Sequence, residues 1–471
     1  MPPPIDKQIF SPRDIVRSGL CIGCGGCVAS PLVAAQEAHS TALRMELDRY
    51  GQYKPRGSPE WLRRRSSEFA RICPFSPSAR NEDELAADRF PDAGQTDSAL
   101  GRFRAAYVGY VAEKDFRDRG SSGGMVSWVL AELLRTGRVD GVTHVVAATD
   151  PQSEGRFFRY RISRNEDEIL AGAKSRYYPV ELSDVLGAIR SVPGRYAVVG
   201  VPCFIKAVQL LRREDPVLRE RIRFTLGLFC GHMKSARFVE SFAWQMGVSV
   251  ADIQEVEFRR KDPSRPASWY TAELSLRDGR TLKKDWWNLA DGDWGAGFFQ
   301  NSACNVCDDV VAETADIAFG DAWVEPYSSD GHGTNVVIVR SPEMEQLVTT
   351  GIHEGRLQLA PVDSRFVEQT QAAGFRQRRE GLAYRLSWRR PGVKPRKRVR
   401  PDSRGLSTRR KLIYRFRSLI TAWSHRVFRF ARLIRRPGLY IRWARLALAI
   451  YHGLAYSRGW LGAMIDRWGQ H

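Results

Sequence analysis

Three cysteines near the start of the chain form its densest group of potential metal ligands. Cys21, Cys24 and Cys27 follow a C-x2-C-x2-C spacing with glycines between them. This spacing lets one tight loop supply three of the four thiolates that a 4Fe–4S cube requires, and the glycines let the backbone pass close to the inorganic sulfurs. Cys73, which precedes a proline, is the best candidate for the fourth ligand. A structural zinc site is the alternative, although zinc is more typically bound by paired C-x2-C knuckles.

The other four cysteines lie between residues 203 and 307. Cys203 and Cys230 each follow a predicted strand, and Cys304 and Cys307 form a C-x2-C pair. Ligands gather at the carboxyl ends of strands in α/β sheets, so the four thiols together predict a second 4Fe–4S cluster. The alternative is that Cys203 and Cys230 are ordinary buried thiols, which are common in protein cores.

Two short motifs have the chemistry to bind an anionic or aromatic group. The turn Gly120–Gly124 precedes a predicted helix, and the free N–H groups of a helix N-terminus suit phosphate. Ser122 could instead cap that helix. The segment Lys174–Tyr177 adds two cations and a phenol, with a solvated turn as the alternative. The chain has neither a G-x-G-x-x-G nor a Walker A motif, so no standard dinucleotide or P-loop site is predicted.

The elements that must position these motifs alternate between strand and helix from residue 104 onward. Apolar periodicity predicts helices over 122–136, 183–189 with Ser183 as its cap, 204–212, 235–246 and 343–351. It predicts strands over 105–112, 142–148, 196–200, 224–229, 255–259, 271–276, 317–320 and 335–340. Because βα units come first and a strand-rich part follows, we expect an α/β fold with a mixed sheet.

Composition divides the chain into two parts. The 471 residues carry a net charge of +20, but residues 385–471 hold 23 Lys and Arg and only two acids, so the basic character belongs to the tail. A secreted disulfide protein is not favoured, because the chain is large and opens without a signal-like segment. No run of 18 apolar residues occurs, so we expect no spanning helix. A cytoplasmic, reducing location is expected.

The basic tail has a pattern of its own. Ser407 can cap a helix that runs to about Arg436, and Pro437 separates it from a second helix. Apolar residues recur at three- and four-residue steps, namely Leu412, Phe416, Leu419, Ile420, Trp423, Val427, Phe430, Ala431 and Ile434. Cationic amphipathic helices with Trp and Phe lie in membrane interfaces, so residues 407–460 predict a peripheral surface on the inner face of the membrane. The alternative is that the stripe packs on the rest of the protein. Nucleic-acid binding is not expected, because a lone Arg-rich helix is not a reader motif.

The order of these motifs resembles the beta subunit of coenzyme F420 hydrogenase and its dehydrogenase relatives, a family that includes 7-hydroxymethyl chlorophyll a reductase. The matching pieces are the Cys21 run, Gly120–Gly124, Lys174–Tyr177, Val199–Cys203, Leu228–Gly231, Cys304–Asp309, Ala315–Asp321 and Gly333–Arg340. Where many relatives read Gly-Trp-Ser/Thr, this chain has His332 and Gly333 before Thr334, so a stacking aromatic residue is not expected there. The tail beyond residue 385 lies outside the resemblance.

The resemblance implies an FAD held near a 4Fe–4S cluster. It divides the chain into a ferredoxin-like iron–sulfur segment over 1–100, an FAD and iron–sulfur domain over 101–384 and a basic helical tail over 385–471. The cofactor-binding residues that it implies are Ser121, Ser122, Gly123, Gly124, Lys174, Ser175, Arg176, Tyr177, Asp321, Thr334 and Asn335. It implies two sets of cluster ligands, Cys21, Cys24, Cys27 and Cys73, and Cys203, Cys230, Cys304 and Cys307. We expect His232, Arg260 and Lys261 near the reacting centre.

The sequence therefore predicts a flavin- and iron–sulfur-dependent oxidoreductase. It would pass electrons between an external donor and a substrate through FAD and two 4Fe–4S clusters, the donor being ferredoxin, reduced coenzyme F420 or another deazaflavin or nicotinamide carrier. The alternative is an electron-transfer beta subunit of a larger hydrogenase- or dehydrogenase-type complex, without a substrate pocket of its own. A zinc-stabilised nucleic-acid binder is a third interpretation of the cysteines and the basic tail.

Overall fold

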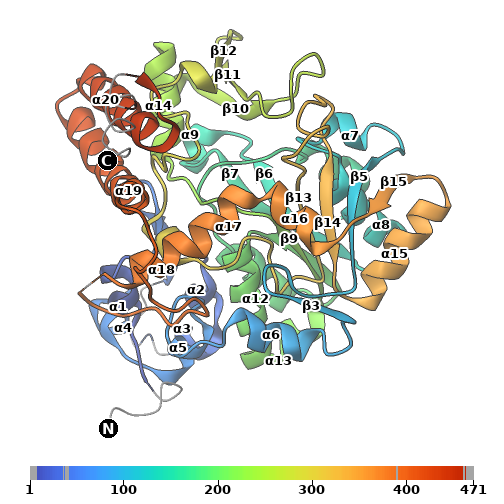
Figure 1. The fold of residues 1–471 in the computed structure, drawn as a ribbon. Coiled ribbons are helices and arrows are strands. Elements are labelled where there is room, and N and C mark those ends of the chain that lie inside the picture. The colour runs from blue at the N-terminus through green and yellow to red at the C-terminus, as the bar shows by residue number, and fades with distance from the viewer. Residues whose placement is uncertain (1–7, 36, 38–41, 389–390, 460–461, 463–471) are drawn as a thin grey trace.

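Eight strands form one mixed sheet at the centre of the molecule (Figure 1). The computed structural model describes residues 8–459 and 462, apart from 36, 38–41 and 389–390. In sheet order the strands are β15 (Leu357–Pro361), β5 (Ala105–Val111), β14 (Asn335–Val339), β13 (Ile317–Asp321), β9 (Ile222–Leu228), β8 (Tyr196–Gly200), β6 (Gly141–Ala147) and β7 (Phe158–Ser163). The mixed sheet is as predicted, except that its two edge strands, β15 and β7, were not expected.

Parallel pairing in the middle of the sheet brings several strand ends to one edge. β6, β8, β9 and β13 run parallel, whereas β14 is antiparallel to both β13 and β5. All residues of β8 and β14 are buried, as expected for strands covered on both faces. The carboxyl ends of β5, β6, β8, β9 and β13 therefore share one edge with the amino end of β14, which is where ligands bind to α/β sheets.

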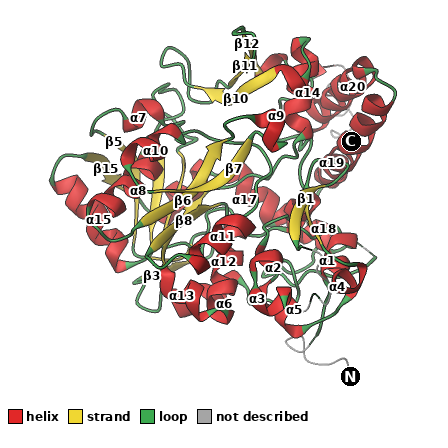
Figure 2. Ribbon diagram, turned by 180° about the vertical axis from the view of Figure 1, so that it is seen from behind, coloured by secondary structure: helices red, strands yellow, loops and turns green. Residues whose placement is uncertain are grey.

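Helices cover both faces of the sheet (Figures 1 and 2). α8 and α15 pack on one face against strand residues such as Leu226, whereas α11 and α12 pack on the other around Val198. The predicted cap at Ser183 is wrong, because Ser183 is the first helical residue and its N–H donates to the Glu181 carboxylate. The helices are α7 (Phe116–Arg119), α8 (Met125–Arg135), α9 (Pro151–Glu154), α10 (Glu166–Ala171), α11 (Ser183–Ser191), α12 (Pro202–Glu214), α13 (Pro216–Arg221), α14 (Arg237–Met246), α15 (Pro342–His353), α16 (Ser364–Thr370), α17 (Ala372–Arg378) and α18 (Glu380–Leu386).

The first hundred residues form short helices and hairpins at one end of the molecule (Figure 1). They pack on α11 and α12 through apolar residues such as Ile15, Phe69 and Ile72. β3 and β4 pair across residue 100, so this segment continues into the sheet domain without a break. The elements are α1 (Pro12–Arg17), α2 (Gly26–Ala29), α3 (Pro31–Ala34), β1 (Arg44–Leu47), β2 (Tyr53–Arg56), α4 (Pro59–Arg63), α5 (Ser67–Ile72), α6 (Glu82–Arg89), β3 (Gln95–Asp97) and β4 (Gly101–Phe103).

A second, antiparallel sheet of three strands supports an aromatic cluster. Its strands are β10 (Ile253–Arg260), β11 (Thr271–Leu276) and β12 (Thr281–Asp285), with the short 3-10 helices η2 (Val250–Asp252), η3 (Trp286–Asn288) and η4 (Ser302–Val306) nearby in the chain. Phe258 of this sheet packs with Phe238 and Phe242 of α14 and with Trp286. These large rings bury a wide apolar surface beside the main sheet.

The basic tail folds back onto the protein as two antiparallel helices, here called the C-terminal hairpin. It comprises α19 (Thr408–Leu433) and α20 (Pro437–Tyr456), seen in red in Figure 1. Ser407 Oγ accepts the Arg410 N–H, which confirms the predicted cap. Ile420, Phe428 and Tyr440 join the apolar core that contains the aromatic cluster. Among the residues described, no helix is long and apolar enough to cross a membrane.

The predicted apolar stripe of α19 is divided between two faces. Ile420 and Ala431 are buried, whereas five of the nine residues point outward, Leu412, Leu419, Trp423, Phe430 and Ile434. The alternative in which the stripe packs on the rest of the protein therefore holds for only part of it. The inward face also contains polar side chains, such as Ser424, whose Oγ accepts the Phe299 N–H at 3.0 Å. Tertiary partners of this kind satisfy polar groups that helical periodicity alone assigns to solvent.

Candidate functional site

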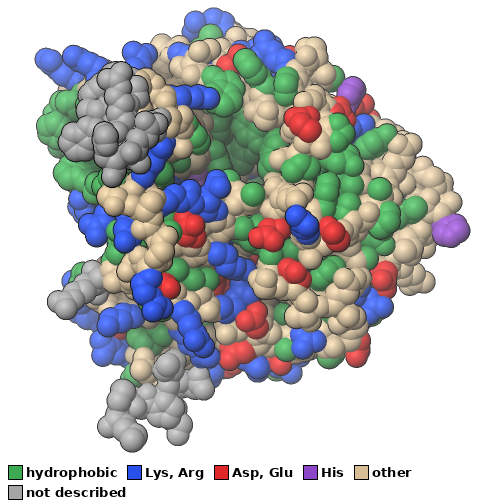
Figure 3. Space-filling view, viewed as in Figure 1, with side chains coloured by type: hydrophobic (Ala, Val, Ile, Leu, Met, Phe, Trp, Pro, Cys, Tyr) green, Lys and Arg blue, Asp and Glu red, His purple; other side chains and the backbone are tan. Residues whose placement is uncertain are grey.

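A cavity of about 900 Å3 lies at the sheet edge where the strand ends meet. It is lined by the ends of β9 and β13, the Gly120–Gly124 turn, the Lys174–Tyr177 segment and the C-terminal hairpin. Figure 3 shows the surface hollowed between the hairpin and the sheet β10–β12, with hydrophobic side chains inside. Its size is within the usual range for small-molecule and cofactor sites. The structure thus brings together motifs that are far apart in the sequence.

The turn Gly120–Gly124 is held by the amino end of β14. Ser122 Oγ donates to Thr334 O at 3.0 Å, and Asn335 Oδ1 accepts the Met125 N–H at 3.2 Å. Asn335 therefore satisfies an amide at the start of α8, so the alternative in which Ser122 caps this helix is wrong. Four residues of the turn, Gly120, Ser121, Ser122 and Gly124, line the cavity.

The close approach of neighbouring backbone explains why residue 123 of the turn is a glycine. A Cβ atom on Gly123 would lie 2.8 Å from Gly109 O and 2.9 Å from Asn335 N, closer than real Cβ contacts. The turn also contacts the second motif, because the Ser175 N–H donates to Ser121 Oγ at 2.8 Å. The two motifs that the sequence assigned to one cofactor thus form a continuous wall.

The cations of the second motif differ in their partners. Lys174 Nζ lies 3.0 Å from Glu257 Oε1, so a carboxylate already balances its charge. Arg176 donates to Val256 O at 3.4 Å and lies 4.9 Å from the centre of the Phe158 ring. Burial lowers the pKa of Arg176, and its buried Nε atom has no hydrogen-bond partner. Because this unsatisfied donor belongs to a residue of the cavity wall, the site fits an anionic group such as a phosphate.

Aromatic rings supply the flat part of the wall. Tyr177 lies 4.8 Å from Trp294 and 5.6 Å from Trp286, measured between ring centres. Tyr270 stacks on Tyr177 with an interplanar angle of 11°. Rings in this arrangement offer a large planar surface to a conjugated ligand. Sequence reasoning missed Trp286, Trp294 and Tyr270, although the three tryptophans within residues 286–294 were a signal.

Asp321, Thr334 and Asn335 lie together at the ends of β13 and β14. Asp321 and Asn335 line the cavity. Asp321 Oδ2 accepts a 2.8 Å hydrogen bond from Arg259, a buried residue that sequence reasoning also missed. The Thr334 carbonyl accepts a hydrogen bond from the Ser122 hydroxyl. Thr334 therefore supports the site indirectly, by holding the Gly120–Gly124 turn.

His232 is the predicted catalytic residue that lines the cavity. Its ring stacks on Trp294 at 4.1 Å between centres, and its buried Nε2 atom has no hydrogen-bond partner. Burial, followed by the charge of Lys234, lowers the pKa of His232 well below its usual value. Lys234, which was not predicted, also lines the cavity and donates to Phe298 O at 2.7 Å. Burial lowers the pKa of Lys234 to about 7.

Arg260 and Lys261 lie near the site but are not among the described residues that line the cavity. Arg260 forms an ion pair with Glu273 at 2.5 Å on the outside of β10. Lys261 Nζ donates to Ser122 O at 2.9 Å and to His332 O at 2.7 Å. Lys261 therefore holds the turn in place, and its contacts are backbone carbonyls.

The first four cysteines converge between α1, α2 and α5. They line a small cavity of about 30 Å3 with Ile15, Phe69 and other apolar residues, the four being Cys21, Cys24, Cys27 and Cys73. Burial, with a smaller contribution from the charge of Cys21, raises the pKa of Cys24 to about 12. Gly23 and Gly25 have φ of 84° and 82°, a conformation that glycine adopts freely. Thiols crowded in this way lose their protons on binding iron, so the donor set fits a 4Fe–4S cluster.

The other four cysteines also come together. Cys203 is the second residue of α12, Cys230 lies after the end of β9, and Cys304 and Cys307 lie at η4. Burial, then the charges of Cys307, Cys230 and Cys304, raises the pKa of Cys203 well above its usual value. This donor set also fits a cluster ligated by four thiolates. Within the described part of the chain, no three His, Cys, Asp or Glu side chains have the spacing required by a single metal ion.

A buried arginine accompanies the second cysteine set. Arg378, the last residue of α17, is only 4% exposed and hydrogen-bonds to Cys307. Burial opposes its charge, but the charges of Cys307, Cys230 and Cys304 raise the pKa of Arg378. A fixed cation therefore faces this set of thiols. Sequence reasoning missed Arg378, because nothing near it in the chain resembles a motif.

The two cysteine sets and the cavity are arranged in series. Cys230 and Cys304 line the 900 Å3 cavity, whereas the first set lines its own small cavity. The charge of Cys24 also contributes to raising the pKa of Cys203, after burial and the thiols of its own set, so the two sets are close. The second set thus lies between the cavity and the first set.

The C-terminal hairpin supplies a wall that the sequence did not predict. Its cavity-lining residues are Arg410, Ile413, Tyr414, Arg417, Tyr451, Ala455 and Tyr456. Arg417 is buried and donates to Gly295 O at 2.7 Å and to Gln300 Oε1 at 2.9 Å. The feature of the sequence that could have identified Arg417 is its position on the inward face of an amphipathic helix. Arginine is expected at the surface, so an arginine on that face is unusual.

Two family models match the part of the chain that forms the cavity. The first describes the amino-terminal part of the coenzyme F420 hydrogenase/dehydrogenase beta subunit and matches residues 106–187. The second describes the carboxyl-terminal part of the same beta subunit and matches residues 194–365. Together they span more than half of the chain. The chain belongs to the coenzyme F420 hydrogenase/dehydrogenase beta-subunit family. The first cysteine set and the C-terminal hairpin lie outside both matched ranges.

Two relatives are similar to the chain at low sequence identity. It is 22% identical over 352 residues to a coenzyme F420-dependent sulfite reductase of Methanocaldococcus jannaschii, covering 71% of this chain and 46% of that protein. It is 23% identical over 341 residues to one subunit of the F420H2 dehydrogenase of Methanosarcina mazei, covering 69% of this chain and 81% of the relative. The chain therefore spans about half the length of the sulfite reductase.

Among solved structures, a chain of the F420-reducing NiFe hydrogenase complex from Methanosarcina barkeri is similar. The identity is 17% and the TM-score is 0.48, and the match covers 63% of this chain and 99% of that chain.

Proposed function

We propose that the protein is a flavin- and iron–sulfur-dependent oxidoreductase that reduces or oxidises a substrate inside the 900 Å3 cavity. The observation that carries this proposal is the composition of the cavity wall. One side has the residues assigned to FAD, and another has Cys230 and Cys304 of the second cysteine set. When bound, FAD would supply two-electron chemistry and the 4Fe–4S clusters one-electron transfer. Family membership supports the redox class.

Different residues of the chain would hold different parts of the FAD. The turn at Ser121, Ser122 and Gly124 offers backbone amides at the start of α8, and the unsatisfied Nε of Arg176 offers a charged donor to a phosphate. Tyr177 and Trp294 would pack on the planar part of the flavin. The apolar lining excludes water, which protects redox intermediates from side reactions.

The serial arrangement supports electron entry through the N-terminal segment. An external donor would contact the first cysteine set, and the second set would pass single electrons to the cavity. A one-electron protein such as ferredoxin fits that order, whereas a deazaflavin or nicotinamide donor would need access to the cavity itself. The competing proposal is a beta subunit that only transfers electrons within a larger complex. The cavity wall formed by the hairpin favours a substrate pocket in this chain.

The test is an anaerobic cofactor analysis with two variants that serve as controls for each other. We expect about one FAD and about eight irons per chain, four for each cysteine set. Cys73→Ser should lose the first half of the iron, and Cys304→Ser the second half, with distinct changes in the electron paramagnetic resonance spectrum. Colourless protein containing zinc would refute the proposal. Turnover with an artificial donor by the isolated chain would favour the enzyme over the electron-transfer subunit.

We further propose that the outward face of the C-terminal hairpin contacts an anionic membrane surface. An apolar ridge runs along this face, with Trp423 47% and Phe430 53% exposed, accompanied by Leu412, Leu419, Leu433 and Leu446. The neighbouring Arg429, Arg435 and Arg445 form no ion pair within the described residues. Each cation near an anionic leaflet contributes about 1 kcal/mol of attraction, and aromatic side chains insert at the headgroup boundary.

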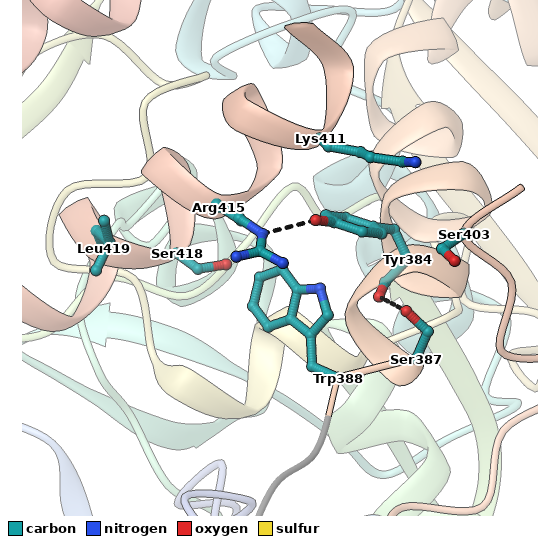
Figure 4. Close-up of a pocket in the computed structure, with 8 residues that line it drawn as sticks. All are labelled: Tyr384, Ser387, Trp388, Ser403, Lys411, Arg415, Ser418 and Leu419. Carbon is teal, nitrogen blue, oxygen red and sulfur yellow. Dashed lines mark hydrogen bonds between the residues drawn. The ribbon is translucent and has the colours of Figure 1, made fainter. Parts of the chain in front are cut away.

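A surface groove beside this ridge has the same mixed character. It has a volume of about 740 Å3 and lies between α18 and α19 (Figure 4). Lys411 and Arg415 supply cations, and Trp388 and Leu419 supply apolar surface. Arg415 Nε donates to Tyr384 OH at 2.7 Å, which fixes the guanidinium at the groove wall. Cations next to apolar surface match the headgroup and upper chain of an anionic lipid.

A further inference from the structure

One end of the cavity concentrates basic side chains that the chain does not neutralise. His232, Lys234, Arg378 and Arg417 all line the cavity, and each is at most 7% exposed. They are close together: after burial, the charges of the other three lower the pKa of His232. None of the four forms an ion pair with a carboxylate in the described part of the chain. Buried cations such as Arg417 normally have such a partner, and an anion bound in this part of the cavity would supply one.

Nearby acids are already engaged elsewhere. Asp291 accepts hydrogen bonds from Ser241 at 2.5 Å and Tyr440 at 2.8 Å. Asp293 forms an ion pair with His452 at 2.8 Å. The thiols of the second cysteine set supply the negative charge that faces Arg378, which hydrogen-bonds to one of them. Asp291 and Asp293 act on Lys234, and Asp293 on Arg417, through their charges, but neither acid forms an ion pair with Lys234 or Arg417 in the described part of the chain.

His232, Lys234 and Arg417 also retain free hydrogen-bonding capacity. Lys234 has three N–H donors and one acceptor, Phe298 O. Arg417 has five donors and three acceptors, Gly295 O, Gln300 Oε1 and Gln377 Oε1. The Nε2 atom of His232 has no partner. A buried polar group left unsatisfied destabilises the folded protein, and a ligand with several acceptor oxygens would satisfy these donors.

We propose that this end of the cavity is a substrate subsite for a carboxylate or an oxyanion of similar size, bound between His232, Lys234 and Arg417. The proposal rests on the proposed function in one respect, that the substrate is transformed in this cavity. The anion would accept hydrogen bonds from all three residues, and the rest of the substrate would extend into the cavity. Arg417 belongs to the hairpin, outside the matched family ranges. The hairpin thus sets the substrate class of this chain.

The test uses small anions as probes of the anaerobic holoprotein. Calorimetric titration with benzoate and with inorganic phosphate separates organic acids from oxyanions, and benzamide is the neutral isostere of benzoate. We expect at least one anion to bind and benzamide to bind at least ~10-fold more weakly, because hydrogen bonds to charged groups carry most of the affinity. Arg417→Gln should weaken anion binding ~10-fold or more. Arg417→Lys, which retains the charge, should lose less.

Arg426→Gln is the matched control. Arg426 is exposed on the outward side of the same helix, so its loss removes the same charge and should leave probe affinity unchanged. Unchanged anion affinity in folded Arg417→Gln, with FAD and iron contents intact, would overturn the subsite. So would loss of FAD or iron in both Arg417 variants, since the charge would then serve the cofactors. Anion binding that depends on Arg417 in a protein without FAD or iron would uphold the subsite and refute the proposed function.

Discussion

Replacing Arg378 with glutamine should lower the reduction potential of the 4Fe–4S cluster that we propose at the second cysteine set. Arg378 is buried and hydrogen-bonds to Cys307, and the charges of Cys230 and Cys304 also act on it. A fixed positive charge at this position stabilises an electron added to the cluster. Glutamine retains a polar group of similar length but removes the charge.

The magnitude follows from Coulomb's law. A hydrogen bond to a ligating sulfur places the guanidinium roughly 6 Å from the centre of a cluster, and an effective dielectric constant of about 20 gives about 3 kcal/mol for one added electron. A tenfold change in a one-electron equilibrium is about 59 mV, so this energy corresponds to about 120 mV. Relaxation of the protein around the changed charge screens part of it. We therefore expect a decrease of about 60–120 mV.

The assay is an anaerobic redox titration monitored by electron paramagnetic resonance. The cluster proposed at Cys21 is the internal control, because the thiols that raise the pKa of Arg378 belong to the second set. Arg378→Lys keeps the charge and should shift the potential by less than half as much. If Arg378→Gln retains full iron and both potentials are unchanged, Arg378 does not face a cluster and the assignment of the second set is wrong.

Three further predictions concern stability and the tail. Lys397→Met should destabilise the protein by about 1–3 kcal/mol, seen as a lower urea midpoint, because it removes the 3.0 Å partner of buried Asp308 and leaves Arg398, 3.6 Å away, as its cation. Burial lowers the pKa of His425 in the folded protein to about 4. As the pH falls, His425 is therefore protonated in the unfolded chain before it is protonated in the folded protein. The contribution of His425 to the free energy of unfolding is fully present above pH 6.5 and decreases by up to about 3 kcal/mol as the pH falls toward 4. The free energy of unfolding of His425→Gln should therefore depend less on pH. Full-length protein should sediment with anionic but not neutral liposomes at low salt, and the double exchange of Trp423 and Phe430 to Ser should release most of it.

Each of these predictions has a control in the chain. Lys394→Met removes an exposed cation next to the Lys397 site and should be nearly neutral. His144→Gln should also flatten the pH profile, because burial lowers the pKa of His144 to about 4 as well; a wild-type profile that is flat between pH 6.5 and 4 would contradict both assignments. Val192→Ser changes an exposed apolar residue away from the hairpin. If it impairs liposome binding as much as the hairpin exchanges do, the ridge is not the contact surface.

Local sequence predicted the elements whose apolar pattern is complete within a few residues. The buried strand Tyr196–Gly200, the helix after Gly124 and the start of α19 at Ser407 are such cases. β7 and β15 were not predicted, because they lie at the sheet edges, where only part of each strand is buried. Edge strands depend on a neighbouring strand for their hydrogen bonds, and that neighbour is distant in the sequence.

The sequence by itself determined the eight thiols, the C-x2-C-x2-C spacing of the first three and the glycine turn before α8, because these features depend on neighbours within a few residues. The tertiary structure alone decided that Arg378 faces the second cysteine set and that Arg417 lines the cavity. It also decided which apolar residues of α19 turn outward, since Ile420 is buried and Trp423 is exposed although both belong to one helical stripe. The reason is physical: a helix offers several faces, and only the surface it packs against selects the one that is buried.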